Sequence, residues 1–224
     1  HHPRGEIAFK FSGIRRQTIL RDVVWSFGKN CLTPVAQLDP VEIGGITIKQ
    51  ATLHNLQNVL DRDLQIGDLV TVERAGDVIP HIVASTPGET RHSCLISHCP
   101  SCRTELVQDG PELRCPNPEC PETKLQNLLA AVRALGIERL GEPTLRKLVG
   151  RLGVKDLRDL FAITVAELRG LDGFKDKAAA NLHREIQQAR RVPASQLLAA
   201  LNIPGIGRNL ARSLLAEHFL DQLA

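Results

Sequence analysis

Four of the six cysteines in the sequence lie within one short stretch, CPSCRTELVQDGPELRCPNPEC. Their spacing is Cys99-x2-Cys102, twelve residues, then Cys115-x4-Cys120, so two close pairs flank an excursion that contains Gly and Pro. Two such pairs are the arrangement that tetrahedral Zn²⁺ requires. Four thiolates close the coordination sphere and leave no position for a substrate water, so the spacing predicts a structural zinc site.

Other interpretations of these cysteines remain open at this point. The pairs are also compatible with reduced thiols without metal, or with an iron site. Cys94 and His98 lie close in the sequence and are alternative ligands. In the simplest case, Cys31 and Cys94 are unliganded thiols.

A second pattern with chemical meaning is a turn containing glycine, which recurs roughly every thirty residues in the second half of the chain. The third copy, Ile203-Pro204-Gly205-Ile206-Gly207, fits the helix-hairpin-helix pattern of apolar-x-Gly-apolar-Gly followed by a helix. Glycine is needed because backbone N–H groups must approach a phosphate at a helix N-terminus, where a Cβ would obstruct them. Arg208 and Arg212 on the next helix add positive charge.

The first two copies each lack one of the two glycines. The first reads Glu138-Arg139-Leu140-Gly141 and the second Asp172-Gly173-Phe174-Lys175, so Arg139 and Lys175 are candidate side-chain contacts instead. The alternative is that all three turns are only compact helical corners. The residues predicted to contact DNA in the turns are Arg139, Gly141, Gly173, Lys175, Gly205, Gly207, Arg208 and Arg212.

Composition limits the class of protein. The 224 residues are 42% hydrophobic, enough for ordinary cores, but only 3% aromatic, which argues against a surface of stacked aromatic platforms. The net charge of +3 is unevenly distributed: residues 121–224 carry 16 Lys and Arg against 11 Asp and Glu, and the remainder is slightly acidic. A polyanion partner is therefore expected at the C-terminal half. With no apolar run of membrane-spanning length and no signal segment, we expect a cytoplasmic protein without a membrane partner, in which disulfides do not persist.

The elements that must position these motifs change character along the chain. EIAFKF (6–11) and DLVTVERAGDVIPHIVAS (68–85) alternate like strands. ATLHNLQNVLDRDLQ (51–65) predicts one short helix, with leucines at helical spacing at Leu53, Leu56, Leu60 and Leu64. Strands interrupted by one helix predict a small barrel such as an OB-fold. Pro87-Gly88 opens a polar connector, and from Leu125 the period is helical. The expected fold is multidomain, β then α, with an OB-fold β-barrel, a small four-cysteine zinc finger and an all-α helix-hairpin-helix array.

This order of modules resembles the C-terminal two-thirds of bacterial NAD-dependent DNA ligases. IAFKF resembles the last nucleotidyltransferase motif of that family, LTPVAQLDPVEIGGITIKQATLHN and IGDLVTVERAGDVIP resemble its OB domain, and LDGFKDKAAANL resembles its second hairpin. The resemblance implies these parts: residues 1–11, the end of the adenylation domain; 12–88, the OB domain; 89–122, the zinc finger; and 123–224, an incomplete helix-hairpin-helix domain.

The resemblance also implies roles for residues that the sequence alone would not single out. Lys10 would contact the adenylate phosphate during nucleotidyl transfer; the alternative is an exposed strand lysine. Arg74, Val78 and Ile79 would meet DNA next to the nick, Arg74 on phosphate and the apolar pair against the minor groove. Lys29 and Asn30 stand where most members carry Arg-Thr, and Cys31 replaces a glycine, which marks this sequence as divergent.

The activity implied by the family is the sealing of nicks in duplex DNA. A lysine is adenylated by NAD⁺, AMP passes to the 5′-phosphate, and the 3′-OH displaces AMP, with Mg²⁺ assisting. The adenylated lysine lies in a K-x-D-G motif that this sequence does not contain. We therefore expect the DNA-binding clamp of a longer enzyme, acting as a monomer and inactive alone. The alternatives are a non-catalytic DNA-binding protein of repair or recombination and a structural zinc protein that binds other proteins.

Overall fold

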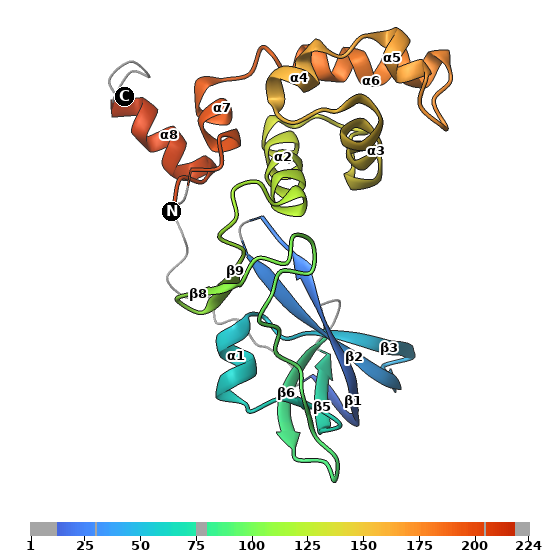
Figure 1. Ribbon diagram of the computed structural model, residues 1–224, viewed down its shortest axis with the longest axis vertical. Coiled ribbons are helices and arrows are strands. Elements are labelled where there is room, and N and C mark those ends of the chain that lie inside the picture. The colour runs from blue at the N-terminus through green and yellow to red at the C-terminus, as the bar shows by residue number, and fades with distance from the viewer. Residues whose placement is uncertain (1–12, 30, 75–79, 204, 218–224) are drawn as a thin grey trace, which may run out of the picture. The chain divides into compact units, whose positions relative to one another are not determined.

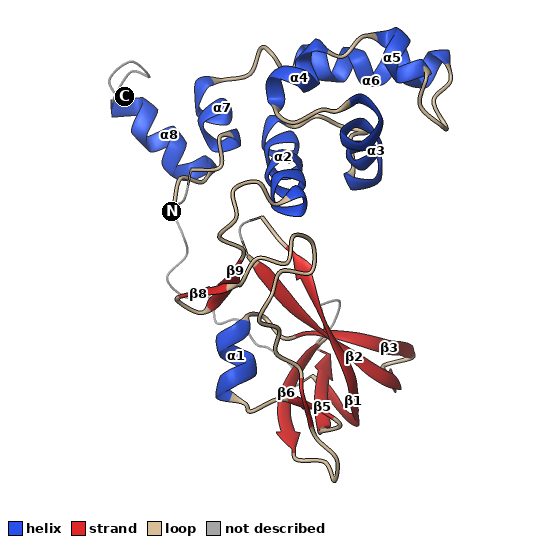
Figure 2. Ribbon diagram, viewed as in Figure 1, coloured by secondary structure: helices blue, strands red, loops and turns tan. Residues whose placement is uncertain are grey.

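The computed structural model describes residues 13–29, 31–74, 80–203 and 205–217. The chain divides into two compact units, residues 1–116 and 117–224. The first unit is built of strands with one short helix, and the second is built of helices (Figures 1 and 2). The change from strand to helical periodicity expected from the sequence is therefore confirmed. No described helix has both the length and the apolar character needed to cross a membrane.

Five strands of the first unit form a closed ring. The long first strand pairs antiparallel with both β2 and β5, β2 pairs with β3, and β5 pairs with β6. A parallel pairing of β3 with β6, Thr52 opposite His81, closes the ring. The bounds are β1 Ile14–Phe27, β2 Leu32–Ile43, β3 Ile46–Thr52, β5 Leu69–Arg74 and β6 His81–Thr86.

Buried and less buried residues alternate along these strands, as expected for a closed barrel with one face turned to the interior. In β2 every second residue from Leu32 to Leu38 is buried, so one face of the strand supplies the core and the other faces outward. The interior is filled by branched residues such as Leu20, Val70 and Val72, all at 0% exposure. A register shift between Leu20 and Asp22 lets β1 turn from β5 toward β2.

The helix of this unit is shorter than predicted. It spans only α1, Leu56–Asp61, and begins after Asn55, whose side chain accepts a hydrogen bond from the Asn58 N–H at 2.9 Å. Ala51 does not belong to the helix because it lies in β3, where it pairs with Ala36 of β2. Of the four leucines at helical spacing, Leu53, Leu56 and Leu64 are buried, whereas Leu60 is 42% exposed.

The cysteine-rich stretch adds a small hairpin to the same sheet. Strands β8 (Val107–Asp109) and β9 (Glu112–Arg114) are joined through Gly110, whose φ is +57°. Leu113 of β9 pairs with Leu32 of β2. The β-hairpin therefore extends the barrel sheet. The short strands β4 (Gln65–Ile66) and β7 (His92–Ser93) form a separate ribbon that leads into this stretch.

The second unit contains seven described helices: α2 Pro121–Leu135, α3 Glu142–Leu152, α4 Leu157–Ala162, α5 Val165–Arg169, α6 Asp176–Gln188, α7 Ala194–Ala200 and α8 Arg208–Glu217. A core of leucines that includes Leu145, Leu148 and Leu182 joins α2 to α6. Leu198 and Ala199 of α7 pack with Ala211 of α8 in a smaller cluster. In Figure 1, α7 lies beside α2.

The three glycine-containing turns share one backbone pattern. The position that corresponds to Gly205 is left-handed in each, with φ of +63° at Arg139, +87° at Gly173 and +79° at Gly205. Two positions later, at Gly141, Lys175 and Gly207, the backbone carbonyl accepts the first hydrogen bond of the following helix at 2.9–3.0 Å. The repeat inferred from the sequence is thus a repeat of conformation, although only two of its three left-handed positions are glycine.

Candidate metal centre and nucleic-acid interface

The four cysteines predicted to bind metal come together. The sulfur atoms of Cys99, Cys102, Cys115 and Cys120 all lie within 4.8 Å of one another. Cys102 Sγ and Cys115 Sγ are 3.5 Å apart, far longer than the roughly 2.0 Å of a disulfide bond. Zn–S bonds of about 2.3 Å at tetrahedral angles place sulfurs about 3.8 Å apart. The cluster therefore has the donor set and the spacing to bind a metal ion such as zinc.

Tight turns bring the two pairs together. The Cys99 N–H donates to the Thr104 carbonyl at 2.8 Å, and Arg103, with φ of +63°, donates back to the Cys99 carbonyl at 3.0 Å. Cys120 directly precedes α2, and its N–H donates to the Asn117 carbonyl at 3.1 Å. Burial raises the pKa of the Cys99 thiol, while hydrogen bonds from the Cys102 and Ser101 backbone lower it. Backbone donors of this kind stabilise a thiolate ligand.

The other candidate ligands have different surroundings. Cys94 is buried, which raises the pKa of its thiol, and its sulfur donates to the Leu64 carbonyl at 3.1 Å. His98 Nδ1 is 2.9 Å from Ser97 Oγ. Burial, followed by Glu112, raises the pKa of Cys31. Within the described part of the chain, the cluster of potential metal ligands consists of the four predicted cysteines alone.

The barrel residues predicted to meet DNA do not form one group. Arg74 pairs with Ile14, the first residue of β1, whereas Lys29 follows Phe27, the last residue of that strand. The two positions therefore lie at opposite ends of β1. Arg74 Nη1 lies 3.5 Å from the point that a Cβ on Gly44 would occupy, so it reaches the β2–β3 turn. The predicted residues Lys10, Asn30, Val78 and Ile79 lie outside the described residues.

In the helical unit, the structure links the end of the third turn to the last turn of α2, the helix that precedes the first turn. Arg208, the first residue of α8, donates from Nη2 to the Ala134 carbonyl at 3.3 Å, and Ala134 lies just before the first turn. An added Cβ at Gly205 or Gly207 would meet nothing within 4 Å, so the third turn presents open backbone. This openness is what close approach of a phosphate requires.

The second turn lies against α3 instead. Lys147 Nζ donates to the Asp172 carbonyl at 2.8 Å, and it lies 3.8 Å from the point that a Cβ on Gly173 would occupy. Lys147 and Arg151, one helical turn apart, line a hollow of about 640 Å³ beside this turn. Neither residue was predicted from the sequence as a candidate contact, although their i, i+4 spacing on one helix places two cations on the same face.

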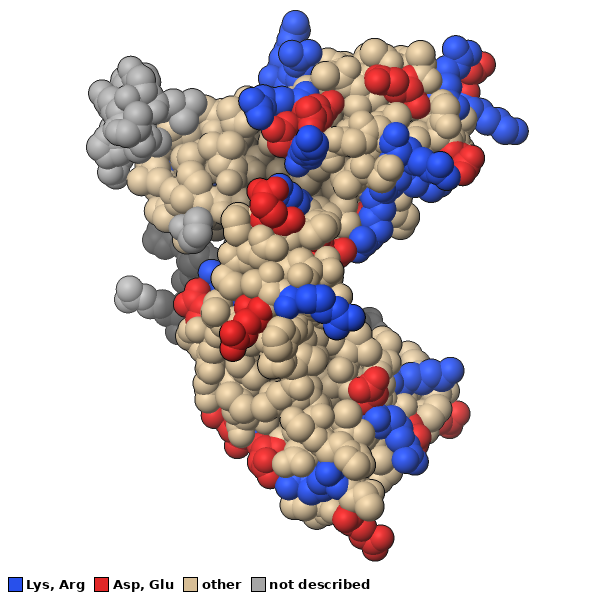
Figure 3. Space-filling model, viewed as in Figure 1, with Lys and Arg blue, Asp and Glu red and all other residues tan. Residues whose placement is uncertain are grey.

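Charged side chains lie in separate groups on the surface of the helical unit. Figure 3 shows Lys and Arg in several groups on the drawn face of this unit, with Asp and Glu among them. Some of these cations are engaged by neighbours: Arg146 contacts both Glu122 and Glu142, and its guanidinium lowers the pKa of Glu122. Arg139, Arg208 and Arg212 are exposed. They have the positions of potential phosphate contacts.

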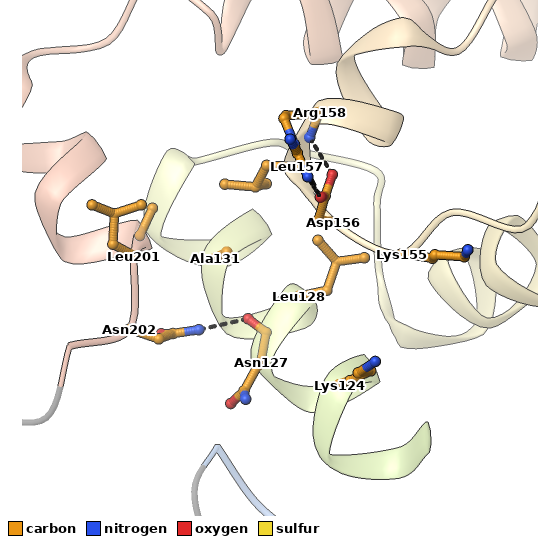
Figure 4. Close-up of a pocket in the computed structure, with 11 residues that line it drawn as sticks. Lys124, Asn127, Leu128, Ala131, Lys155, Asp156, Leu157, Arg158, Leu201 and Asn202 are labelled. Atoms are coloured by element: carbon orange, nitrogen blue, oxygen red, sulfur yellow. Dashed lines mark hydrogen bonds and ion pairs between the residues drawn. The ribbon is translucent and has the colours of Figure 1, made fainter. Parts of the chain in front are cut away.

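A second hollow, of about 520 Å³, lies between α2, the start of α4 and the end of α7 (Figure 4). Leu128, Leu157 and Leu201 contribute to its apolar lining. On its rim Arg158 pairs with Asp156 at 2.7 Å, and the hydrogen bond from Asn202 to the Asn127 carbonyl is drawn beside it.

Comparison with known proteins agrees with the geometry. Residues 17–93, which cover most of the barrel, match the family model of the NAD-dependent DNA ligase OB-fold domain. The chain is 40% identical to a DNA ligase of Lacticaseibacillus paracasei over 98% of this chain and 34% of the relative. It is 40% identical to one of Thermomicrobium roseum (99% and 33%) and 37% identical to one of Aquifex aeolicus (96% and 31%).

The match covers nearly all of this chain but only part of each relative, since the chain spans about a third of the length of the curated relatives it matches. The similarity extends beyond the barrel to the cysteine cluster and the helical unit. Over nearly all of its length the chain is therefore similar to one part of these DNA ligases, and its barrel matches the OB-fold domain of the NAD-dependent DNA ligase family.

Proposed function

We propose that this chain is the DNA-binding clamp of a NAD-dependent DNA ligase that seals nicks in duplex DNA. The observation that carries the proposal is the coexistence of the ligase-type barrel with three turns of one backbone pattern, followed in each case by a helix N-terminus. Such turns suit the contact of phosphates, which holds a duplex without reading its bases. The helical unit would thus be a helix-hairpin-helix array.

The barrel would contact the duplex at the nick. OB-folds bind nucleic acid on the face of their second and third strands and through the loops between strands one and two and between strands four and five. Lys29 lies in the first of these loops, and Arg74 ends the strand before the second. Arg74 would contact phosphate, and Val78 and Ile79 the minor groove. In the complete enzyme Lys10 would stabilise the adenylate phosphate.

Zinc would be held by Cys99, Cys102, Cys115 and Cys120, whose sulfur spacing fits the ion. Bound there, it would supply structural cross-linking and no chemistry of the reaction, because four thiolates leave no open position. NAD⁺ and Mg²⁺ would serve the nucleotidyl-transfer chemistry of the complete enzyme. The residues of this chain would bind and orient the nicked duplex for that chemistry.

The proposal is tested by fluorescence anisotropy with labelled nicked and intact duplexes of several sequences. We expect the zinc-loaded chain to bind duplex with similar affinity across sequences and with a strong salt dependence. Failure to bind either duplex at low salt would refute the clamp.

A second measurement distinguishes the clamp from a stand-alone binding protein. Incubated with NAD⁺, Mg²⁺ and nicked duplex, the chain is expected to form no joined product by itself. In the complete enzyme, Lys10→Ala should abolish sealing while leaving duplex affinity unchanged. If the complete protein has no ligase activity, only the alternative of a non-catalytic DNA-binding protein would stand.

A further inference from the structure

Helix α7 is fastened to α2 at two points. Gln196 Nε2 donates to the Ala134 carbonyl at 3.0 Å. Asn202 Nδ2, just after α7, donates to the Asn127 carbonyl at 2.7 Å, the hydrogen bond drawn in Figure 4. The two acceptors are seven residues apart, so they lie two turns apart on one face of α2. Ala134 belongs to the last turn of the helix, whose carbonyls lack partners within the helix and are open to side-chain donors.

These contacts hold the third turn from both sides. Asn202 directly precedes the turn and is left-handed, with φ of +56°, a conformation that Asn adopts more readily than most residues. Arg208 directly follows the turn and donates to the same Ala134 carbonyl as Gln196. From Ala134 the chain passes through Gly136 into the first turn. The position of the third turn is therefore set relative to the first by side chains outside both turns.

The two stretches of chain that adjoin this joint, residues 133–141 and 205–212, are rich in arginine. Arg133, in the last turn of α2, is exposed, as are Arg139, Arg208 and Arg212. Within residues 133–141 and 205–212, Glu138 is the single acidic residue of the sequence. These two stretches therefore carry four cations and one carboxylate beside open glycine backbone, a charge balance that favours a polyanion.

We propose that the first and third turns form one continuous surface for the phosphates of a duplex, in which Arg133 is a phosphate-contacting residue and Asn202 and Gln196 are positioning residues. This inference rests on the proposed DNA-binding function and goes beyond it, because none of these three residues lies in a turn motif. Turns held at a fixed spacing lose less conformational freedom when they bind a duplex. The hydrogen bonds of Gln196 and Asn202 to α2 should therefore contribute to affinity.

The contact role of Arg133 is tested by the salt dependence of duplex binding by the full chain. Arg133→Gln should weaken binding several-fold at low salt and reduce the slope of log affinity against log salt by about 0.9, the share of one phosphate contact. The matched control is Arg184→Gln, which removes an exposed cation on α6 whose guanidinium contacts only Asn181 in the described structure. The control should leave the slope unchanged.

The positioning role of Asn202 is tested with Asn202→Gly. Glycine keeps the left-handed backbone accessible and removes the Nδ2 donor. We expect a several-fold loss of affinity and a reduced salt slope, with the thermal unfolding midpoint within a few degrees of the parent. A purely structural role would shift the midpoint and leave the slope unchanged.

Two results separate this inference from the proposed function. If Arg133→Gln and Asn202→Gly keep the parent's slope and affinity while a Gly207 variant loses affinity, the clamp stands and the shared surface is wrong. If the parent chain does not bind duplex, both are wrong.

Discussion

The guanidinium of Arg91 lies 2.7 Å from the carboxylate of Asp68, a side chain that is only 1% exposed, and joins the connector after β6 to the barrel. Asp68 also accepts hydrogen bonds from the N–H groups of Gln65 and Gly88 at 2.9 and 3.1 Å. The backbones are in close contact here, because a Cβ on Gly88 would lie 2.1 Å from the Gly67 carbonyl. We call this contact of Asp68 with Arg91, Gln65 and Gly88 the latch. It fixes the start of the segment that leads to the cysteine cluster.

The latch predicts a stability change in acid. Burial by itself would raise the pKa of Asp68, but Arg91 and the two N–H groups outweigh it and hold that pKa below its usual value. The lowered pKa stabilises the fold above the unfolded pKa of about 3.9, and this contribution is lost as pH falls through the folded pKa. Asp68→Asn should therefore cost about 1–3 kcal/mol at pH 7, since Arg91 keeps Asp63 as a partner, and should flatten the acid limb of the stability curve.

Urea unfolding from pH 7 to pH 2 measures this effect. The control is Asp22→Asn, a change of an exposed strand carboxylate. Equal acid dependence in Asp68→Asn and the parent would show that the latch does not govern the barrel's acid stability.

Metal removal should unfold the cysteine stretch and spare the barrel. We expect elemental analysis to find about one zinc per chain, and Cys115→Ser to lower that content, because three thiolates bind more weakly than four. The single tryptophan, Trp25, is buried and donates to the Cys94 carbonyl at 2.9 Å, so its fluorescence reports on the barrel. Chelation should leave its emission unchanged; less than about half an equivalent of zinc in fresh protein would contradict the site.

Adding side chains to the third turn should reduce affinity for duplex. The threonine side chain of Gly207→Thr would extend into open space and place a good capping residue before α8. The free energy of unfolding should therefore change little. Affinity should fall several-fold and equally across sequences, because the lost approach is to phosphate. Gly205→Val should in addition destabilise the fold by about 1–2 kcal/mol, because valine is strained at a φ of +79°. A sequence-dependent loss of affinity would show that the turn reads bases.

The left-handed Arg139 predicts opposite effects on stability and binding. Arg139→Gly relieves the strained backbone and should raise the free energy of unfolding by up to about 1 kcal/mol, the part of the strain not offset by glycine's greater freedom when unfolded. It should also weaken duplex binding. Arg139→Ala keeps the strain and should weaken binding equally. Normal affinity in both variants would show that the Arg139 side chain does not contact DNA.

Features that depend on residues close together in the sequence could be predicted from the sequence alone. The four cysteines are close in the chain, so their spacing alone predicted the cluster that the structure brings together. Strand and helix periodicities, the polar connector at Pro87-Gly88 and the conformation of the repeated turns likewise depend on neighbouring residues, and they were readable without coordinates. The helix α1 was predicted too long, because pairing of Ala51 with Ala36 overrides the local helical spacing of the leucines.

Only the tertiary structure decided which distant segments meet. The β-hairpin β8–β9 joins the barrel through Leu113 and Leu32, and the third turn is fastened to α2 through the carbonyls of Asn127 and Ala134. Every residue carries a backbone carbonyl, so an acceptor of this kind has no signature in the sequence. Its role appears only when packing of the apolar faces brings a donor from a distant segment within hydrogen-bonding distance.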